Sequence, residues 1–303
     1  MERNGVKVGI TGATGFLGTY LSAHLRRAGL RVVEFREEEG LPVEEGVPVV
    51  PFTLDSPVHP ESLGGLEALI HAAYDFRPRT WDEIVEVNVN GSAGLLKAAR
   101  EAGVKRIVVI STMAAFDGCR SMYGKAKLLM ERDALELGAV VVRPGLMWGG
   151  GPGGLVGNLA RLVARAAVVP LAGAGRQPLY LNHREDISRF LARAVTEDLG
   201  EINIAFTLTC DVPWTFRQIL AGLAEAQGRS VRFVSVPWQP LYWGLKTLEL
   251  IGLRPGFRSD SLVSLMNQDP APDFTVYGTL GLRFRDFSPR EACEWSENKE
   301  GSP

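Results

Sequence analysis

The amino-acid sequence predicts an α/β protein with a doubly wound parallel sheet, followed by a smaller C-terminal α/β domain. Short apolar runs alternate with stretches of helical periodicity through the first half of the 303-residue chain, as strands and crossover helices do in a parallel sheet. A glycine-rich turn at residues 12–18 follows the first apolar run. Beyond Pro144 the alternation weakens and glycine-dense loops appear at 149–154 and 172–176, which predicts a second domain.

Periodicity locates the elements along the chain. We predict six strands from apolar runs, at 6–10, 31–35, 47–50, 66–71, 106–110 and 139–142. Apolar residues at helical spacing predict three helices, at 16–28, 81–101 and 121–137. In the second half we expect helices at 186–195, with Asp186 as N-cap, and at 215–227, then a strand at 231–236.

These elements divide the chain into three parts. We expect a dinucleotide-binding Rossmann-type domain at residues 1–170 and a substrate-binding domain at 171–296. Segments within about 179–204 are candidates for returning to the first domain. Residues 297–303 are polar, and we expect them to form a frayed tail.

Composition narrows the functional class. Lys plus Arg number 33 and Asp plus Glu number 35, and this balance argues against a broad surface for nucleic acid or anionic membranes. The N-terminus does not resemble a signal peptide, and no apolar run reaches the ~20 residues that span a bilayer. Three widely spaced cysteines, without histidines at ligand spacing, predict free thiols and no metal site. We expect a cytoplasmic protein with a small-molecule substrate and neither nucleic-acid nor membrane partners.

One apolar stretch, residues 237–252, has two interpretations. It contains Leu241, Trp243, Leu245, Leu248 and Leu250. Such a face usually packs as core against a neighbouring element, and this interpretation is favoured. A helix that lies on a membrane surface or on a partner protein is the alternative.

The glycine-rich turn predicts a dinucleotide site. Gly12 permits a tight turn, Gly15 lets the backbone approach a pyrophosphate, and Gly18 lets the helix pack closely. The pyrophosphate would then lie on the free N–H groups at the helix N-terminus. We expect cofactor contacts from the residues of this turn: Gly12, Thr14, Gly15, Phe16, Leu17 and Gly18.

The Gly-x-x-Gly-x-x-Gly spacing resembles the short-chain dehydrogenase/reductase superfamily, in particular its extended and atypical branch of NAD(P)-dependent epimerases and dehydratases. The resemblance implies further cofactor contacts, at Leu54, Asp55, Ala72, Ala73, Pro144 and Gly145. It also places Arg36 where an acidic residue would bind the ribose hydroxyls. Because an arginine suits a 2′-phosphate, NADP is slightly favoured over NAD, although the glutamates at 37–39 would disfavour a phosphate.

Tyr123 and Lys127 form a Tyr-x-x-x-Lys pair, which a helix places on one face. A neighbouring ammonium and an oxidised nicotinamide would lower the pKa of the tyrosine, which could then exchange a proton with the substrate. The resemblance implies that Lys127 also holds the nicotinamide ribose. For the Ser/Thr that binds the substrate oxygen, Thr112 is preferred and Ser111, itself expected beside the cofactor, is the reserve. If the family's longer Ser-Ser-Ser form is aligned with the end of this strand, Met113 occupies the position of the Ser/Thr instead.

Other polar residues have structural interpretations. His71 lies on an apolar strand, where a buried core histidine is more common than a catalytic base. The resemblance implies a structural role for Asn88 and for Glu131. Arg176, in the second glycine loop, is a candidate contact for an anionic group or an ordinary surface side chain.

These features together predict an NAD(P)-dependent oxidoreductase or epimerase that moves hydride between nicotinamide and a carbinol or ketone. The resemblance suggests a nucleotide-sugar substrate most readily. A reductase of a small ketone or aldehyde is the alternative within enzymes. A non-catalytic NAD(P)-binding sensor or assembly module is the third hypothesis, favoured by the short separation of 11 positions between Thr112 and Tyr123. The resemblance also implies a homodimer, with the helices at 81–101 and 121–137 at its contact.

Overall fold

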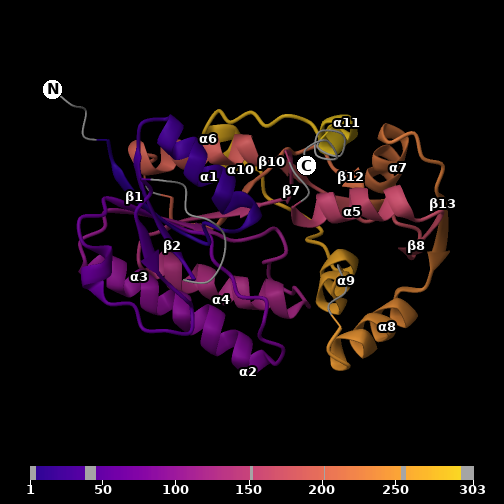
Figure 1. The fold of residues 1–303 in the computed structure, drawn as a ribbon, viewed down its shortest axis with the longest axis horizontal. Coiled ribbons are helices and arrows are strands. Elements are labelled where there is room, and N and C mark those ends of the chain that lie inside the picture. Colours follow the sequence, from indigo (N-terminus) through magenta and orange to yellow (C-terminus); the bar gives the residue numbers. More distant parts are fainter. Residues whose placement is uncertain (1–4, 38–45, 151–152, 201, 254–256, 295–303) are drawn as a thin grey trace.

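The computed structural model describes residues 5–37, 46–150, 153–200, 202–253 and 257–294. Its centre is a seven-stranded sheet in the order β11-β6-β5-β4-β1-β2-β3, with every neighbouring pair parallel (Figure 1). The strands are β1 (Lys7–Thr11), β2 (Arg31–Arg36), β3 (Val49–Pro51), β4 (Ala68–His71), β5 (Arg106–Ile110), β6 (Val140–Pro144) and β11 (Phe206–Leu208). The strand order reverses between β1 and β4, where doubly wound folds bind ligands. The predicted fold class is confirmed.

Helices cover both faces of this sheet (Figure 1). On one face lie α1 (Phe16–Arg27) and α6 (Arg184–Thr196), which bury Leu21 and Leu191 against the strands. On the other lie α3 (Gly91–Glu101) and α4 (Met122–Glu136), with a core that includes Leu95 and Ala134. The two cores fix the carboxyl ends of the strands, and therefore the site above them.

The helix predicted at 81–101 is interrupted. It consists of α2 (Trp81–Ile84), a π-helical stretch at Val85–Asn90 and α3. Within the π-helical stretch, the Asn88 side chain accepts a hydrogen bond from the Asp75 N–H at 2.7 Å and donates to the Asp75 carbonyl at 3.0 Å. Local π geometry of this kind commonly serves a functional region. Here it accompanies two bonds that hold the loop after β4, in keeping with a structural role for Asn88.

A second lobe contains three two-stranded sheets. These are β7 (Leu146–Trp148) with β10 (Leu181–His183), β8 (Val168–Ala172) with β13 (Arg232–Val236), and β9 (Pro178–Leu179) with β12 (Trp214–Thr215). Its helices are α5 (Gly154–Arg165), α7 (Phe216–Ala226), α8 (Trp238–Leu250), α9 (Ser259–Met266) and α11 (Pro289–Cys293). A short α10 (Thr275–Thr279) and a 3₁₀ turn at Pro60–Leu63 lie near the first lobe. Because α5 and β8 pack into the second core, segments of this lobe begin before residue 170. The predicted tail at 297–303 lies outside the described residues.

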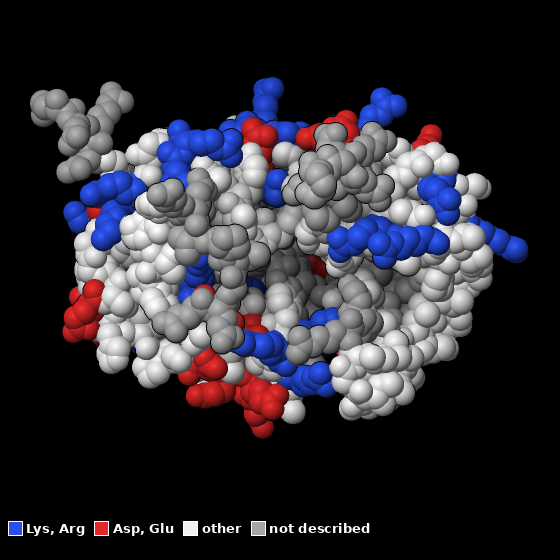
Figure 2. Space-filling view, in the orientation of Figure 1, with Lys and Arg blue, Asp and Glu red and all other residues white. Residues whose placement is uncertain are grey.

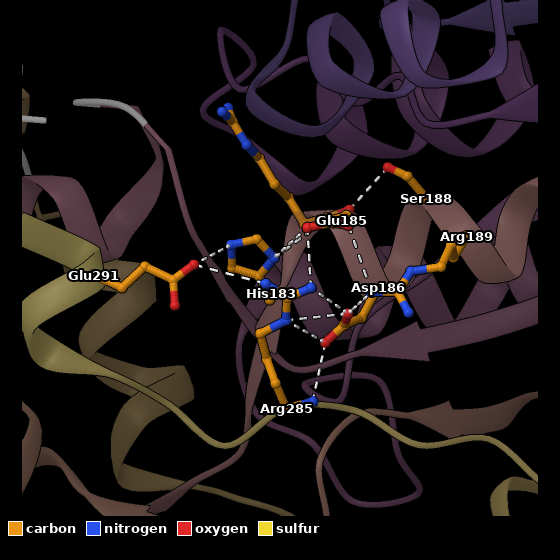
Figure 3. A network of polar contacts seen from close by, with 8 residues as sticks. His183, Glu185, Asp186, Ser188, Arg189, Arg285 and Glu291 are labelled. Atoms are coloured by element: carbon orange, nitrogen blue, oxygen red, sulfur yellow. Dashed lines mark hydrogen bonds and ion pairs between the residues drawn. The ribbon is translucent and has the colours of Figure 1, made fainter. Parts of the chain in front are cut away.

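The start of α6 differs from the prediction that Asp186 caps it. His183 is the N-cap, and Asp186 lies in the first turn, where its carboxylate binds Arg285 at 3.0 Å and Arg189 at 2.7 Å. His183 in turn lies 3.3 Å from the Glu291 carboxylate (Figure 3). The Asp186 carboxylate pairs with two arginines and does not cap the helix. The ion pairs of Asp186 and His183 join α6 to α11 and to Arg285, in the segment that precedes α11.

The sequence predicts free thiols and no apolar run long enough to span a bilayer. Cys119, Cys210 and Cys293 are free and buried. Across the described ranges, no helix is both long enough and apolar enough to cross a bilayer.

Candidate active site

A cavity of about 630 Å³ lies at the carboxyl ends of β1 and β4. Most of the predicted cofactor contacts line it: Gly12, Thr14, Gly15, Phe16, Leu17, Gly18, Arg36, Leu54, Ala72, Ala73, Ser111, Tyr123 and Lys127. Gly12 has a positive φ of 70°, and a Cβ there would approach the Ala73 nitrogen to 2.9 Å. A Cβ at Gly18 would overlap the Gly12 carbonyl oxygen. The turn therefore needs both glycines, and its open backbone N–H end fits a dinucleotide pyrophosphate.

Three predicted cofactor contacts lie elsewhere. Asp55 is exposed and does not line this cavity, because the turn after β3 buries Leu54 and directs the next side chain outward. Pro144 and Gly145 line an adjoining cavity instead. Pro144 ends β6 of the central sheet, and Gly145 begins the connection from there to β7 of the second lobe, so both residues lie on the side of the adjoining cavity.

Arg36 lines the cofactor cavity but is not a free cation. Its side chain is 9% exposed and lies 3.6 Å from the Glu34 carboxylate. Glu37, the next residue after Arg36, also lines the cavity and binds Arg77, another lining residue, at 2.7 Å. Charges of both signs therefore lie at this end of the cavity.

The predicted catalytic pair, Tyr123 and Lys127, lies on α4. Ser121 caps this helix by accepting a hydrogen bond from the Gly124 N–H at 3.1 Å. Tyr123 and Lys127 both face the cofactor cavity, one turn apart. Lys127 is 3% exposed, and its ammonium donates to the Ile110 carbonyl at 2.9 Å. Burial lowers the pKa of Lys127 to about 8, while the nearby Glu131 acts in the opposite direction.

Tyr123 lies among aromatic rings. The centroid of Tyr74 is 4.9 Å away, edge to face, and that of Phe76 is 5.7 Å away. Burial raises the pKa of Tyr123 to about 12, and a hydrogen bond with Thr112 opposes this rise. The sequence argument expected a neighbouring ammonium together with an oxidised nicotinamide to lower this pKa. Lys127 itself points to the Ile110 carbonyl and lies over the ring of Tyr74, 5.1 Å from its centroid.

The candidates for the substrate-oxygen donor have different surroundings. Thr112 has its hydroxyl beside the Tyr123 phenol. Ser111 instead donates to Glu131 at 2.5 Å, and Glu131 also binds Arg143 at 2.6 Å. Met113 lines the adjoining cavity and has no group that could donate. Of the three, Thr112 is the residue whose hydroxyl contacts the Tyr123 phenol.

His71 is buried beneath the site. Its Nδ1 lies 2.7 Å from the Thr11 hydroxyl and its Nε2 lies 2.8 Å from the Ser92 hydroxyl. Because the Thr11 oxygen already accepts from the Ala72 and Ala73 N–H groups, it donates to Nδ1, and the ring donates from Nε2. Burial lowers the pKa of His71 to about 3. These contacts fit a neutral core histidine.

The adjoining cavity, of about 400 Å³, opens between the two lobes. It shares Phe16, Phe76 and Tyr123 with the cofactor cavity, so Tyr123 can reach a molecule in either space. Its far wall comes from α9, with Asp260, Ser264 and Leu265. We call this space the substrate cavity.

Sequence reasoning missed several of these residues. Tyr74 and Phe76 follow Ala73 directly, and two aromatic residues next to a cofactor strand could have drawn attention. Asp260 gives no comparable signal, because it lies 137 positions after Tyr123 and only the fold brings α9 to α4. Within the described residues no group of three or more His, Cys, Asp and Glu side chains is placed to hold a metal ion.

Comparison with known proteins places this site in a family. The model of the NAD dependent epimerase/dehydratase family matches residues 8–205, which hold the glycine turn, Tyr123 and Lys127. The chain belongs to this family. It is accordingly an oxidoreductase or epimerase of the extended short-chain dehydrogenase/reductase type, as the sequence predicted. A nicotinamide cofactor is supported, since members of this family are NAD-dependent.

The chain is also similar to individual relatives and solved structures. The chain is 30% identical over 236 residues to ceramide reductase of Caulobacter vibrioides, across 76% of this chain and 73% of that protein. It is 26% identical over 257 residues to 4-hydroxy-2-methyl-3-oxo-4-farnesyl-3,4-dihydroquinoline-1-oxide ketoreductase of Stigmatella aurantiaca, across 76% of each. The solved structure of MoeE5 with UDP-glucuronic acid and NAD shares the fold. Its TM-score is 0.74 at 22% identity, over 96% of this chain and 98% of that one.

Proposed function

We propose that this enzyme reduces the carbonyl of a largely apolar ketone or aldehyde with NAD(P)H. The observation that carries the proposal is the lining of the substrate cavity beside Tyr123. Most of its side chains are aliphatic or aromatic, including Leu146, Met147, Leu155, Leu179, Phe216, Phe257 and Leu265. Pockets of this kind bind apolar ligands and use a few polar groups to orient them. Thr112 and Tyr123 supply such groups at one end.

A nucleotide sugar is the second candidate, favoured by the fold shared with MoeE5. Its diphosphate would need cationic partners. Among the described residues that line the substrate cavity, Arg258 is the one basic side chain, and its guanidinium lies over the Phe76 ring. Arg176 is exposed and is not part of the lining. The cavity therefore favours an apolar molecule over a diphosphate.

The protonation state of Tyr123 suits reduction. Because burial raises the pKa of its phenol to about 12, the side chain carries its proton at neutral pH and can donate it to a carbonyl oxygen. The Thr112 hydroxyl lies beside it and can hold the same oxygen. Lys127, one turn along α4, faces the cofactor cavity and can bind a ribose hydroxyl there. Reduced nicotinamide, when bound, supplies the hydride that the carbonyl carbon accepts.

A substrate panel tests the proposal. Purified enzyme is mixed with NADPH or NADH and either a medium-chain methyl ketone or a hydrophobic aldehyde, and in parallel with NAD+ or NADP+ and UDP-glucose. Loss of NAD(P)H absorbance and product chromatography are then measured. We expect the carbonyl compounds to be reduced and UDP-glucose to be left unchanged. Turnover of UDP-glucose without reduction of any apolar carbonyl would overturn the proposal.

Substitution of Tyr123 separates an enzyme from a cofactor-binding module. We expect Tyr123→Phe to lower kcat by about 10²–10⁴-fold, because general acid catalysis contributes on that order. The dissociation constant for NADPH should change little, since the ring remains in place. A wild-type chain that binds NADPH and reduces no carbonyl, with Tyr123→Phe indistinguishable from it, would favour the sensor or assembly module.

A further inference from the structure

The largest group of exposed apolar side chains lies at the end of α8 and just beyond it. Trp243 is 66% exposed, Leu250 74%, Ile251 68% and Leu253 54%, with Leu248 beside them at 38%. We call these five residues the α8 patch. Exposed apolar side chains are ordinary one at a time, but a contiguous group of large ones marks an interaction surface.

The inner face of α8 already has its packing partners. Trp238, Leu241, Tyr242 and Leu245 are partly buried against the core of the second lobe. Trp243 and Leu250 lie seven positions apart, which places them on one stripe of the opposite side of the helix. The sequence-based preference for a helix packed as core is therefore correct for one face of α8, and the other face is open to solvent.

The α8 patch adjoins the entrance of the substrate cavity. A groove of about 490 Å³ is lined by Leu250 and Leu253 at one end and by Phe76 and Arg258 at the other. Phe76 and Arg258 also line the substrate cavity. Phe76 is itself 56% exposed, so a groove with both apolar and charged lining residues connects the α8 patch to the neighbourhood of Tyr123.

Cations border this apolar surface. Arg79, Lys246 and Arg258 line the groove, and Lys246 lies on α8 between Trp243 and Leu250. The groove also contains two carboxylates. Glu249 binds the Ser259 N–H and hydroxyl at 2.7 Å, and Asp260 binds two backbone N–H groups of α4. Arg79 and Arg258 donate to the backbone carbonyls of Glu249 and Phe76 at 2.9 and 3.3 Å. These carbonyls are uncharged, so both guanidinium charges remain in the groove, and long basic side chains of this kind can face anionic groups while their stems cover apolar surface.

The space-filling view shows the same arrangement (Figure 2). The surface over α8, at the lower right, is largely uncharged, and basic side chains lie beside it toward the centre of the molecule. Acidic side chains gather farther along the lower edge. The basic border is therefore local, which is compatible with a net charge of −2 for the chain.

We propose that the α8 patch docks on the surface of a lipid bilayer that contains anionic phospholipid, and that an apolar substrate passes from this bilayer into the substrate cavity. Tryptophan and leucine beside lysine and arginine are typical of helices that lie in the membrane interface without crossing it. The part of the proposal that concerns substrate delivery rests on the proposed reductase function, and the docking itself does not.

Vesicle binding tests the docking. The full chain, without substrate or cofactor, is sedimented with vesicles of phosphatidylcholine and with vesicles that also contain phosphatidylglycerol. We expect wild-type protein to sediment with the anionic vesicles. The double substitution Leu250→Glu and Ile251→Glu should weaken this binding at least tenfold, since it places charges where apolar groups would be buried. The control is Val212→Glu, which likewise replaces an exposed apolar side chain by a carboxylate, at a residue near β12 that is 50% exposed. This variant should bind as wild type does.

Three outcomes would overturn the docking: no sedimentation of wild-type protein, equal binding by the double variant, or equal loss in the Val212→Glu control. A dimer that the double variant dissociates, in the absence of vesicle binding, would assign the α8 patch to self-association instead. Delivery is tested separately. The double variant should reduce a water-soluble short-chain ketone as wild type does and a long-chain ketone held in vesicles more than fivefold more slowly. Vesicle binding without reduction of any ketone would leave the docking standing and refute the reductase proposal.

Discussion

The carboxylate of Asp260 accepts a hydrogen bond from the backbone N–H of Tyr123 at 3.0 Å, and its other oxygen accepts from the neighbouring Met122 N–H at 2.8 Å. These donors belong to the first turn of α4, where helical N–H groups have no partner within the helix. Asp260 lies on α9 in the second lobe and lines the substrate cavity. One residue of the substrate-cavity wall thus holds the backbone of Tyr123, the proposed proton donor.

This contact predicts that Asp260 positions Tyr123. We expect Asp260→Ala to lower kcat about tenfold, corresponding to ~1.4 kcal/mol at the transition state. The free energy of unfolding should fall by about 1 kcal/mol, as for a lost helix cap. The dissociation constant for NADPH should stay unchanged, because Asp260 does not line the cofactor cavity. Steady-state kinetics, urea unfolding and cofactor titration measure the three quantities.

A matched control distinguishes positioning from stability. Asp273 also binds a backbone N–H with its carboxylate, that of Thr275 at 2.8 Å, but on an exposed turn. Asp273→Ala should therefore leave kcat unchanged. If both substitutions lowered kcat equally, the effect would belong to general stability and Asp260 would have no special part in positioning Tyr123.

Tyr74 predicts a second effect on the catalytic pair, because its ring contacts both members. The Lys127 ammonium lies 5.1 Å from its centroid and the Tyr123 ring lies 4.9 Å away. A cation over an aromatic face is stabilised by about 0.5–2 kcal/mol. We expect Tyr74→Leu to lower the pKa of Lys127 further below its ordinary value and to reduce kcat about tenfold. The limb of the pH–rate profile that follows Lys127 should then move to lower pH.

The conservative variant of Tyr74 completes this experiment. Tyr74→Phe keeps the ring and removes the hydroxyl, so kcat and the pH–rate profile should both stay close to those of wild type. A large loss of activity in Tyr74→Phe would instead indicate that the Tyr74 hydroxyl takes part in the reaction.

Much of this fold could be predicted from the sequence, for local reasons. Buried parallel strands appear as short apolar runs, and the glycines of the cofactor turn are fixed by close backbone contacts such as that of Gly18 with the Gly12 carbonyl. Tyr123 and Lys127 were predictable because four positions along a helix bring two side chains to one face. Information of this kind lies within a few residues of the feature that it predicts.

The features that escaped prediction depend on contacts between distant segments. Asp186 was expected to cap a helix, but it is held by Arg285, 99 positions away, which no local pattern reveals. Tyr123 is buried partly by rings from the loop after β4, and burial raises its pKa, which the spacing of Tyr123 and Lys127 along one helix does not reveal. The apolar lining of the substrate cavity likewise comes from several segments of the second lobe.

Arg36 predicts a cofactor preference that remains to be measured. Its guanidinium lines the cofactor cavity at the carboxyl end of β2, where a 2′-phosphate would gain a charge-assisted hydrogen bond. We expect wild-type enzyme to bind NADPH more tightly than NADH. Arg36→Ala should weaken NADPH binding about tenfold, or ~1.4 kcal/mol, and leave NADH binding unchanged. Fluorescence titration with each cofactor measures the ratio.

The control for this prediction is on the same strand. Arg31 lies at the other end of β2, outside the cofactor cavity, and donates to the Gly5 carbonyl at 3.0 Å. Arg31→Ala should change neither affinity. Tighter binding of NADH by wild type, with no change of ratio in Arg36→Ala, would show that the ion pair with Glu34 neutralises Arg36 and that the enzyme prefers NAD.

His71 predicts how the stability of the fold depends on pH. Its pKa is about 3 in the folded chain, against an ordinary value of about 6.5 when the chain unfolds. Between these values the unfolded state binds a proton that the folded state does not. The free energy of unfolding contributed by this group is therefore intact above pH ~6.5 and declines as the pH falls toward 3. Urea unfolding at successive pH values should show this decline.

Substitution of His71 assigns the decline to this residue. His71→Asn should lower the free energy of unfolding at neutral pH, since it disturbs the bonds to Thr11 and Ser92, each worth about 1 kcal/mol. It should also make that free energy less dependent on pH between about 6.5 and 3, because no proton has to be excluded from the core. His59→Asn, on the exposed loop before the 3₁₀ turn, serves as control and should keep the wild-type slope. A slope that His71→Asn does not reduce would mean that other groups govern acid unfolding, His183 with its pKa of about 4 being the next to test.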